Sequence, residues 1–122
     1  MINFDCVRDI VFFLDSNFEY RHNGILHPIK LKSVIDGYPF NKYLESEVYL
    51  AIEYIVDKSL VELAKPNCPP RLSIFIKITP LGYDFLAAVK DETVWSKVKK
   101  ESKDLAKFTI QQMISLALAS IL

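Results

Sequence analysis

Residue types that build common active sites are scarce in this sequence. Its 122 residues include only three glycines, too few for a glycine-rich loop that cradles a phosphate. The cysteines, Cys6 and Cys68, are far apart, and His22 and His27, on either side of an Asn-Gly turn, have no further ligands at the spacing of a zinc site. We therefore expect a protein without a metal site and without a cofactor.

The chain also lacks an excess of charge of either sign. Fifteen basic residues balance fifteen acidic ones, so no overall field draws the protein to DNA or to an anionic membrane, and nucleic-acid binding would need a local basic patch. The longest uncharged run, 108–122, is short for a bilayer span, and the first residues do not resemble a signal peptide. We expect a cytoplasmic protein that does not enter a membrane.

Groupings typical of enzymes are missing as well. Neither Ser33 nor Ser46 lies in the pattern of a nucleophile elbow. Asp91 and Glu92 are adjacent carboxylates, but they stand at the start of a predicted helix, where acidic groups complement the helix dipole. The sequence therefore predicts no enzymatic activity.

What remains is the composition of a single folded domain. Hydrophobic residues make up 51% of the chain and charged residues 25%, which separates it from disordered sequences. A chain of this length can bury one core.

The first segment predicts an amphipathic helix that ends near Asn17 and is capped by Asn3 or Asp5. Its apolar stripe recurs at steps of three and four residues and consists of Phe4, Val7, Val11, Leu14 and Phe18. Phe12 lies on the opposite, polar face next to Arg8. We expect the C-terminal helix to cover Phe12, with a partner subunit as the alternative.

The middle of the chain predicts a strand, a helix and a hairpin. Alternation of apolar residues with Lys30 and Lys32 favours a short strand over 29–34. A helix follows over 45–58, with Val48, Ile52 and Ile55 as its core line. Two β-rich runs, 60–63 and 72–78, are joined by a loop with three prolines and predict an antiparallel hairpin.

Three helices are expected after the hairpin. Thr79 and Pro80 begin one, as N-cap and first helical residue, and Gly82 in its first turn allows close backbone packing. A second helix opens at 91–93, and the last begins between Ser102 and Lys107.

This order is that of a winged helix, in which the hairpin is the wing. The predicted fold is mainly α with a small antiparallel β-hairpin, a winged helix-turn-helix plus C-terminal helices. We expect residues 1–90 to form the winged-helix domain and residues 91–122 a helical extension packed on it, as one structural unit.

Several segments resemble a known family. The run ITPLGYDFLAAVKDETVWSKVK, together with FDCVRDIVFFLD, SEVYLAIEYIVDKSLVE and FTIQQMISLAL, is similar to the domain-of-unknown-function family 2513, found mainly in bacteria and their phages. Ser59 stands where the family commonly has a glycine at the end of the middle helix. The resemblance implies a winged-helix fold and no particular activity.

The charges do not favour DNA reading by the middle helix, which holds four acidic residues and only Lys58 as a cation. The hairpin is more favourable, because Lys65, Arg71 and Lys77 have no acid between them and Asn67 lies near its tip. We therefore expect a winged-helix regulatory or binding module that contacts DNA through the wing.

The alternative is a protein-interaction module, such as a phage-type adaptor or inhibitor. The exposed line of the middle helix is predicted to be Glu47, Leu50, Ala51, Tyr54 and Lys58, and its leucine and tyrosine are types that interfaces use. Leu116 lies on the otherwise polar side of the last helix. Phe12, Leu50, Tyr54 and Leu116 are thus the candidate partner-binding residues, and a homodimer through the terminal helices is expected.

Overall fold

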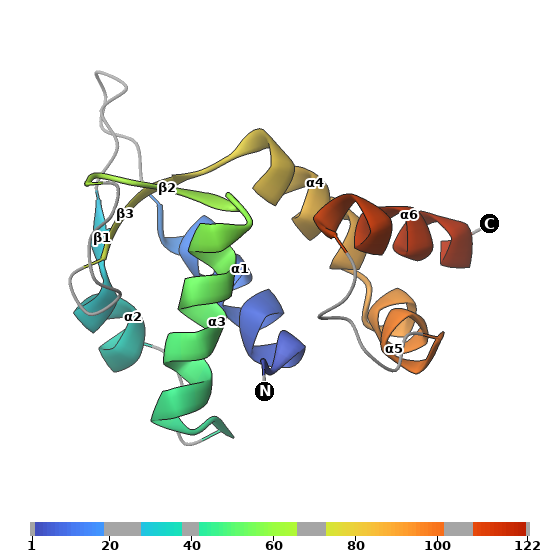
Figure 1. Cartoon of the computed structure of the whole chain (residues 1–122), viewed down its shortest axis with the longest axis horizontal. Coiled ribbons are helices and arrows are strands. Elements are labelled where there is room, and N and C mark those ends of the chain that lie inside the picture. Colours follow the sequence, from blue (N-terminus) through green and yellow to red (C-terminus); the bar gives the residue numbers. More distant parts are fainter. Residues whose placement is uncertain (1, 19–27, 38–41, 66–72, 102–108, 122) are drawn as a thin grey trace.

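Helices dominate the molecule, and a small sheet lies at one end of it (Figure 1). The computed structural model describes residues 2–18, 28–37, 42–65, 73–101 and 109–121. The elements of these residues are, in chain order, α1 (Phe4–Asn17), β1 (Ile29–Lys30), α2 (Leu31–Gly37), α3 (Glu45–Asp57), β2 (Val61–Leu63), β3 (Ile74–Ile78), α4 (Pro80–Val89), α5 (Glu92–Glu101) and α6 (Ile110–Ile121).

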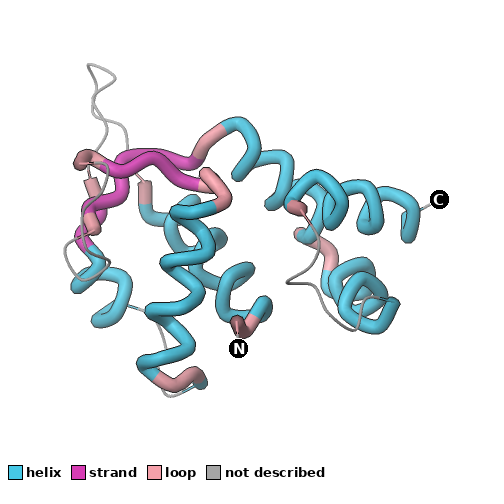
Figure 2. The backbone as a smooth tube through the Cα atoms, in the orientation of Figure 1, coloured by secondary structure: helices cyan, strands magenta, loops and turns pink. Residues whose placement is uncertain are grey.

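The three strands form one antiparallel sheet with the order β1-β3-β2 (Figure 2). Val61 of β2 pairs with Ile78 of β3, and the register shifts between Glu62 and Leu63. The predicted hairpin and the mainly helical fold class are therefore confirmed. The order of the elements is compatible with the winged-helix arrangement.

The strand predicted over 29–34 is wrong beyond its first two residues. Only Ile29–Lys30 pairs with β3, and the chain then turns into helix α2. Leu31 and Val34 are both buried, and their spacing of three residues places them on one face of a helix. The short apolar pattern fits either a strand or a helix, so the sequence alone does not distinguish the two.

The helix starts follow their predicted caps. The Asn3 side chain accepts a hydrogen bond from the Cys6 amide at 3.2 Å and begins α1. Thr79 Oγ1 accepts from the Gly82 amide at 3.0 Å, with Pro80 as the first residue of α4. Both caps confirm the prediction, since each satisfies an amide that the helix itself cannot.

The last helix begins later than predicted, at Ile110. Its start is fixed by a reciprocal pair of hydrogen bonds. Thr109 Oγ1 accepts from the Gln112 amide at 3.1 Å, and Gln112 Oε1 accepts from the Thr109 amide at 2.9 Å. The apolar residues Ile110, Met113 and Ala117 are buried, and α6 packs chiefly on α4 and α5.

The end of α3 requires a left-handed residue, and that residue is Ser59, with φ of 59°. Its amide donates to the Val56 carbonyl at 3.1 Å, and the Leu60 amide donates to the Ile55 carbonyl at 3.0 Å. These two bonds form a Schellman motif, in which glycine is the usual left-handed residue. Ser59 therefore occupies the position where the resemblance implies a glycine.

We expect Ser59→Gly to stabilise the protein by about 1 kcal/mol, because glycine adopts positive φ without the steric penalty of an L side chain. The midpoint of urea unfolding measures this change. As a control, Ser96→Gly in the exposed middle of α5 should destabilise by a similar amount. Equal destabilisation by both substitutions would contradict the assignment of strain to Ser59.

Candidate functional site

A cluster of charged residues joins α1 to the segment between α4 and α5. At its centre is Arg8, which is only 7% exposed although the sequence places it on a polar face. Its Nε donates to the Val89 carbonyl at 2.8 Å and its Nη2 to the Lys90 carbonyl at 3.0 Å. Arg8 thus binds the free carbonyls at the C-terminal end of α4, where a cation also complements the helix dipole.

Two further interactions hold the guanidinium group of Arg8. Nη1 forms an ion pair with Glu92 Oε1 at 3.1 Å, at the start of α5. The guanidinium carbon lies 5.0 Å from the centre of the Phe12 ring and 5.9 Å from that of Trp95. One side chain of α1 therefore contacts both α4 and α5.

Asp5 makes a second connection between α1 and α5. Its Oδ1 accepts hydrogen bonds from Trp95 Nε1 and from Lys99 Nζ, both at 2.7 Å. Partial burial acts to raise the pKa of Asp5, but the hydrogen bonds from Lys99 and Trp95 outweigh it and hold the pKa below its usual value. The carboxylate is therefore ionised at neutral pH, and its Oδ1 is held by two donors of α5.

Asp9 completes the cluster. It accepts a hydrogen bond from the Tyr43 hydroxyl and pairs with Lys42 Nζ at 3.3 Å. Together these groups line a polar depression of about 280 Å³, formed by Asp5, Arg8, Asp9, Lys42, Tyr43 and Glu92. Each carboxylate already accepts from a neighbouring donor, so the arrangement holds helices together and does not present a free base.

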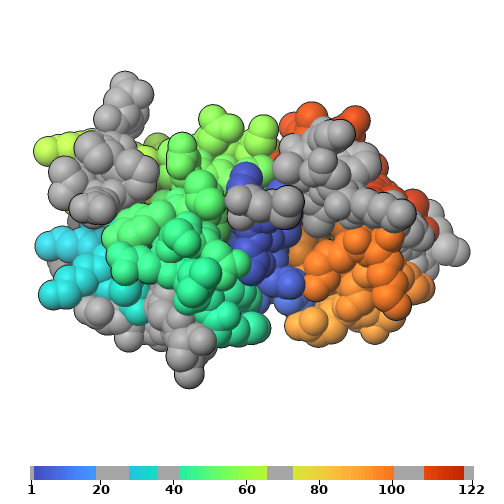
Figure 3. Space-filling view, turned by 60° about the horizontal axis from the view of Figure 1, so that its bottom comes forward, coloured from blue at the N-terminus to red at the C-terminus, as the bar shows by residue number. Residues whose placement is uncertain are grey.

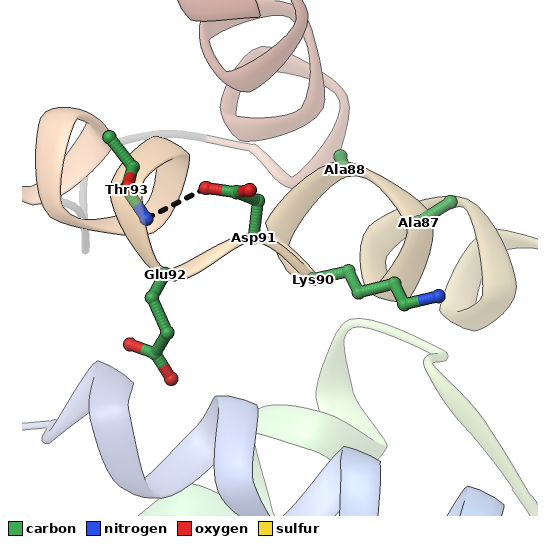
Figure 4. A pocket seen from close by; sticks show the side chains of 6 residues that line it. All are labelled: Ala87, Ala88, Lys90, Asp91, Glu92 and Thr93. Carbon is green, nitrogen blue, oxygen red and sulfur yellow. Dashed lines mark hydrogen bonds between the residues drawn. The ribbon is translucent and has the colours of Figure 1, made fainter.

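A wider depression of about 540 Å³ lies beside the α4–α5 joint (Figure 4). Asp91 Oδ1 accepts from the Thr93 amide at 2.8 Å and from the Val94 amide at 3.1 Å, so this carboxylate caps α5 and stands at a helix start as the sequence predicts. The remaining lining residues are exposed or small, namely Ala87, Ala88, Lys90 and Glu92. Nothing in this depression selects a ligand.

The outward-facing residues of α3 differ from those predicted. Ala51 is buried and Tyr54 is only 6% exposed, because this side of α3 packs on α1, where the Phe4 and Tyr54 rings meet edge to face at 5.2 Å. The observed line of exposed residues on α3 is shifted by about one residue from the predicted line. It consists of Ser46, Leu50, Glu53 and Asp57, which we call the α3 outer face.

Tyr54 is therefore covered within the chain, and the prediction that its side chain lies on the exposed line of this helix is wrong. Burial raises the pKa of its hydroxyl to about 12, with a smaller contribution from Asp57. The hydroxyl oxygen is buried and has no hydrogen-bond partner within the described part of the chain. A buried hydroxyl without a partner destabilises a fold.

Removing this hydroxyl should stabilise the protein. We expect Tyr54→Phe to raise the free energy of unfolding by about 1 kcal/mol, since it keeps the ring contact with Phe4 and removes an unsatisfied group. Chemical denaturation measures the change. Tyr43→Phe is the matched control, because the Tyr43 hydroxyl donates to Asp9 and its loss should destabilise. Destabilisation by both variants would refute this account of Tyr54.

The β2–β3 hairpin shows less free positive charge than its sequence suggests. Lys77 of β3 forms an ion pair with Glu62 on the neighbouring strand, at 3.3 Å. Lys65 is exposed just after β2. Asn67 and Arg71 lie outside the described residues. The sequence has no acidic residue between Lys65 and Lys77, but the pairing of the strands brings Glu62 next to Lys77.

The other two candidate contact residues are partly covered. Phe12 is half-buried beside Arg8 and packs against the core, and its cover by the C-terminal helix stays a prediction. Leu116 is also half-buried and packs against the core. The exposed leucine of α6 is Leu118, at 51%.

The described residues contain neither a cluster of metal ligands nor a membrane-spanning helix. No group of three histidine, cysteine or acidic side chains in them could hold a metal ion. His22 and His27 lie outside these residues. Among the described helices, none is long and apolar enough to cross a bilayer.

Comparison with known proteins assigns the family. The family model described as "Hypothetical protein (DUF2513)" matches residues 2–108. The chain belongs to this family. The match spans α1 to α5 and ends just before α6, so the FTIQQMISLAL segment lies almost wholly beyond the part shared with DUF2513. No curated protein and no solved structure matches the chain.

Proposed function

We propose that this DUF2513 chain is a non-enzymatic, cytoplasmic winged-helix binding module whose α3 outer face binds a protein partner. The observation that carries the proposal is the composition of this face. Leu50 is 38% exposed at its centre, and Glu53 and Asp57 follow it at helical spacing. An exposed leucine beside charges is typical of the core and rim of a protein interface.

The same face is unsuited to DNA. In a winged helix this helix would lie in the major groove, where arginine, lysine, asparagine or glutamine reads the bases. The α3 outer face offers none of these, and its carboxylates repel phosphates. Lys58, which directly follows α3, lies 3.9 Å from Asp57, and Asp57 has the more exposed side chain of the two.

Photo-crosslinking tests the proposal. We would place a benzophenone side chain at Leu50 in cells that produce the chain, with the exposed Asp84 of α4 as the control position. A defined crosslinked protein at Leu50, and not at Asp84, is the expected result. Crosslinks of equal yield at both positions, or none at Leu50, would reject α3 as a binding surface.

DNA binding through the wing is the second candidate, since exposed Lys65 makes no ion pair with any other described residue. Titration of random duplex DNA at low and moderate salt separates the two functions. Salt-sensitive binding that Lys65→Glu weakens would support DNA binding through the wing in place of protein binding through α3, because phosphate contacts depend on cations. We expect no binding even at low salt.

A further inference from the structure

Four charged residues of α5 fall into two pairs, one engaged with α1 and one facing outward. Glu92 pairs with Arg8, and Lys99 with Asp5, so both are turned towards α1. The outward residues are Thr93, Ser96, Lys97 and Lys100, which we call the α5 outer face. Lys97 and Lys100 are its charged residues, and neither forms an ion pair with another described residue; one acidic residue, Glu101, follows them at the end of the helix.

The charges of α3 divide in the same way. Glu47 accepts hydrogen bonds from the Asn3 side chain at 2.7 Å and from the Leu44 amide at 2.9 Å. These bonds lower its pKa and keep its charge at the start of the helix. Within the described residues, Glu53 on the α3 outer face forms no ion pair, and Asp57 pairs with Lys58 at 3.9 Å. The α3 outer face is therefore acidic where the α5 outer face is basic.

Both helices lie on one face of the molecule. Figure 3 shows α3 and α5 on either side of α1, which lies between them. The polar cluster of α1 is internally paired and adds no strong charge between the two. A two-fold axis running along α1, in the plane of contact, would bring the α3 of each copy opposite the α5 of the other.

We propose that a second copy of this chain is the partner of the α3 outer face, and that it docks through its α5 outer face in a two-fold dimer. The inference rests on the proposed function, since it names the occupant of the same surface. Two-fold symmetry makes each contact twice, so the acidic and basic faces complement each other within one closed pair. Because the net charge of the chain is zero, two copies do not repel each other overall.

Leu50 has a suitable apolar contact in such a dimer. The methylene stems of Lys97 and Lys100 can cover it while their ammonium groups reach Glu53 and Asp57. Exposed ion pairs are individually weak, so the dimer should be weak and sensitive to salt. The screening length falls from about 10 Å at 0.1 M salt to about 3 Å at 1 M. We expect association at the lower salt and at least about tenfold weaker association at the higher.

Sedimentation equilibrium of the full chain, from micromolar to about millimolar concentration, measures the association. The acidic face is reversed by Glu53→Lys with Asp57→Lys, and the basic face by Lys97→Glu with Lys100→Glu. Each double variant alone should associate at least about tenfold more weakly than the original chain. An equimolar mixture of the two should regain a discrete dimer, because both of its contacts are again between opposite charges.

Matched controls test the specificity of the effect. Asp84→Lys on α4 and Lys32→Glu on α2 reverse exposed charges elsewhere and should leave the association unchanged. A chain that is monomeric at every concentration, or a mixture that fails to regain the dimer, would overturn the proposal. So would a dimer that Leu118→Glu abolishes and the charge reversals spare, since its interface would be α6.

The two proposals can fail separately. If the crosslink from Leu50 captures a different protein and the chain remains monomeric, the α3 outer face is a binding surface but the second copy is not its partner. If Leu50 captures the chain itself, both proposals gain support. If Leu50 captures nothing, the proposed function fails, whatever the state of association.

Discussion

Replacing Arg8 with alanine should lower the free energy of unfolding by about 3 kcal/mol. The side chain is buried, and it supplies hydrogen bonds to the carbonyls of Val89 and Lys90 at the end of α4. Hydrogen bonds from charged donors contribute about 1.5–3 kcal/mol each, and truncation also opens space beside Phe12 and Trp95. Urea unfolding followed by circular dichroism measures the loss.

Lysine at the same position should recover only part of this stability. A single ammonium group cannot reproduce the planar arrangement with which the guanidinium contacts two carbonyls and Glu92. As a matched control, Lys90→Ala removes an exposed cation from the same joint and should change stability by less than about 0.5 kcal/mol. An Arg8→Ala variant as stable as this control would show that Arg8 does not hold α1 to α4.

Replacing Gly82 with alanine should destabilise the fold by a similar amount. A Cβ atom at this position would lie 2.2 Å from the Leu60 carbonyl oxygen and 2.6 Å from Ile78 Cγ2. The Leu60 carbonyl also accepts a hydrogen bond from the Thr79 amide at 3.1 Å. The backbone at Leu60 therefore cannot move away from the new Cβ atom without losing this hydrogen bond. Forced overpacking costs about 1–3 kcal/mol, and we expect the upper end and a fall in Tm of roughly 10 °C.

The sign of this effect is opposite to that expected from helix propensity. Alanine is favoured over glycine by about 1 kcal/mol inside an unconstrained helix. The exposed Ala87 of the same helix serves as the control, because Ala87→Gly should destabilise by about that amount through propensity alone. A Gly82→Ala variant with a raised Tm would show that the first turn of α4 does not pack closely against the Leu60 carbonyl.

The parts of the fold that sequence predicts best are those fixed by local chemistry. Asn3 and Thr79 begin helices because each side chain accepts an amide hydrogen bond three residues ahead. The hairpin follows from two β-rich runs joined by a proline-rich loop. The place of Gly82 in the first turn of a helix predicts close backbone packing. None of these inferences needs knowledge of distant residues.

The candidate site was harder to predict, because it depends on residues far apart in the chain. Arg8 meets Val89, 81 residues later, and no local pattern indicates that a single arginine on a polar face will be buried. Tyr54 looked exposed by helical periodicity, but contact with Phe4 of α1 covers it. The cross-strand pairing of Glu62 with Lys77 likewise becomes visible only with the register of the sheet.

The attachment of the first helix to the α4–α5 joint also affects how the molecule opens. Arg8 and Asp5 lie within the first six residues of α1, and their partners belong to the last third of the chain. Fraying of the N-terminal turns would release Val89, Glu92 and Trp95 together. Amide protons of α5 should therefore exchange with solvent at the pace set by the opening of α1, so that the two ends of the polypeptide behave as one cooperative unit.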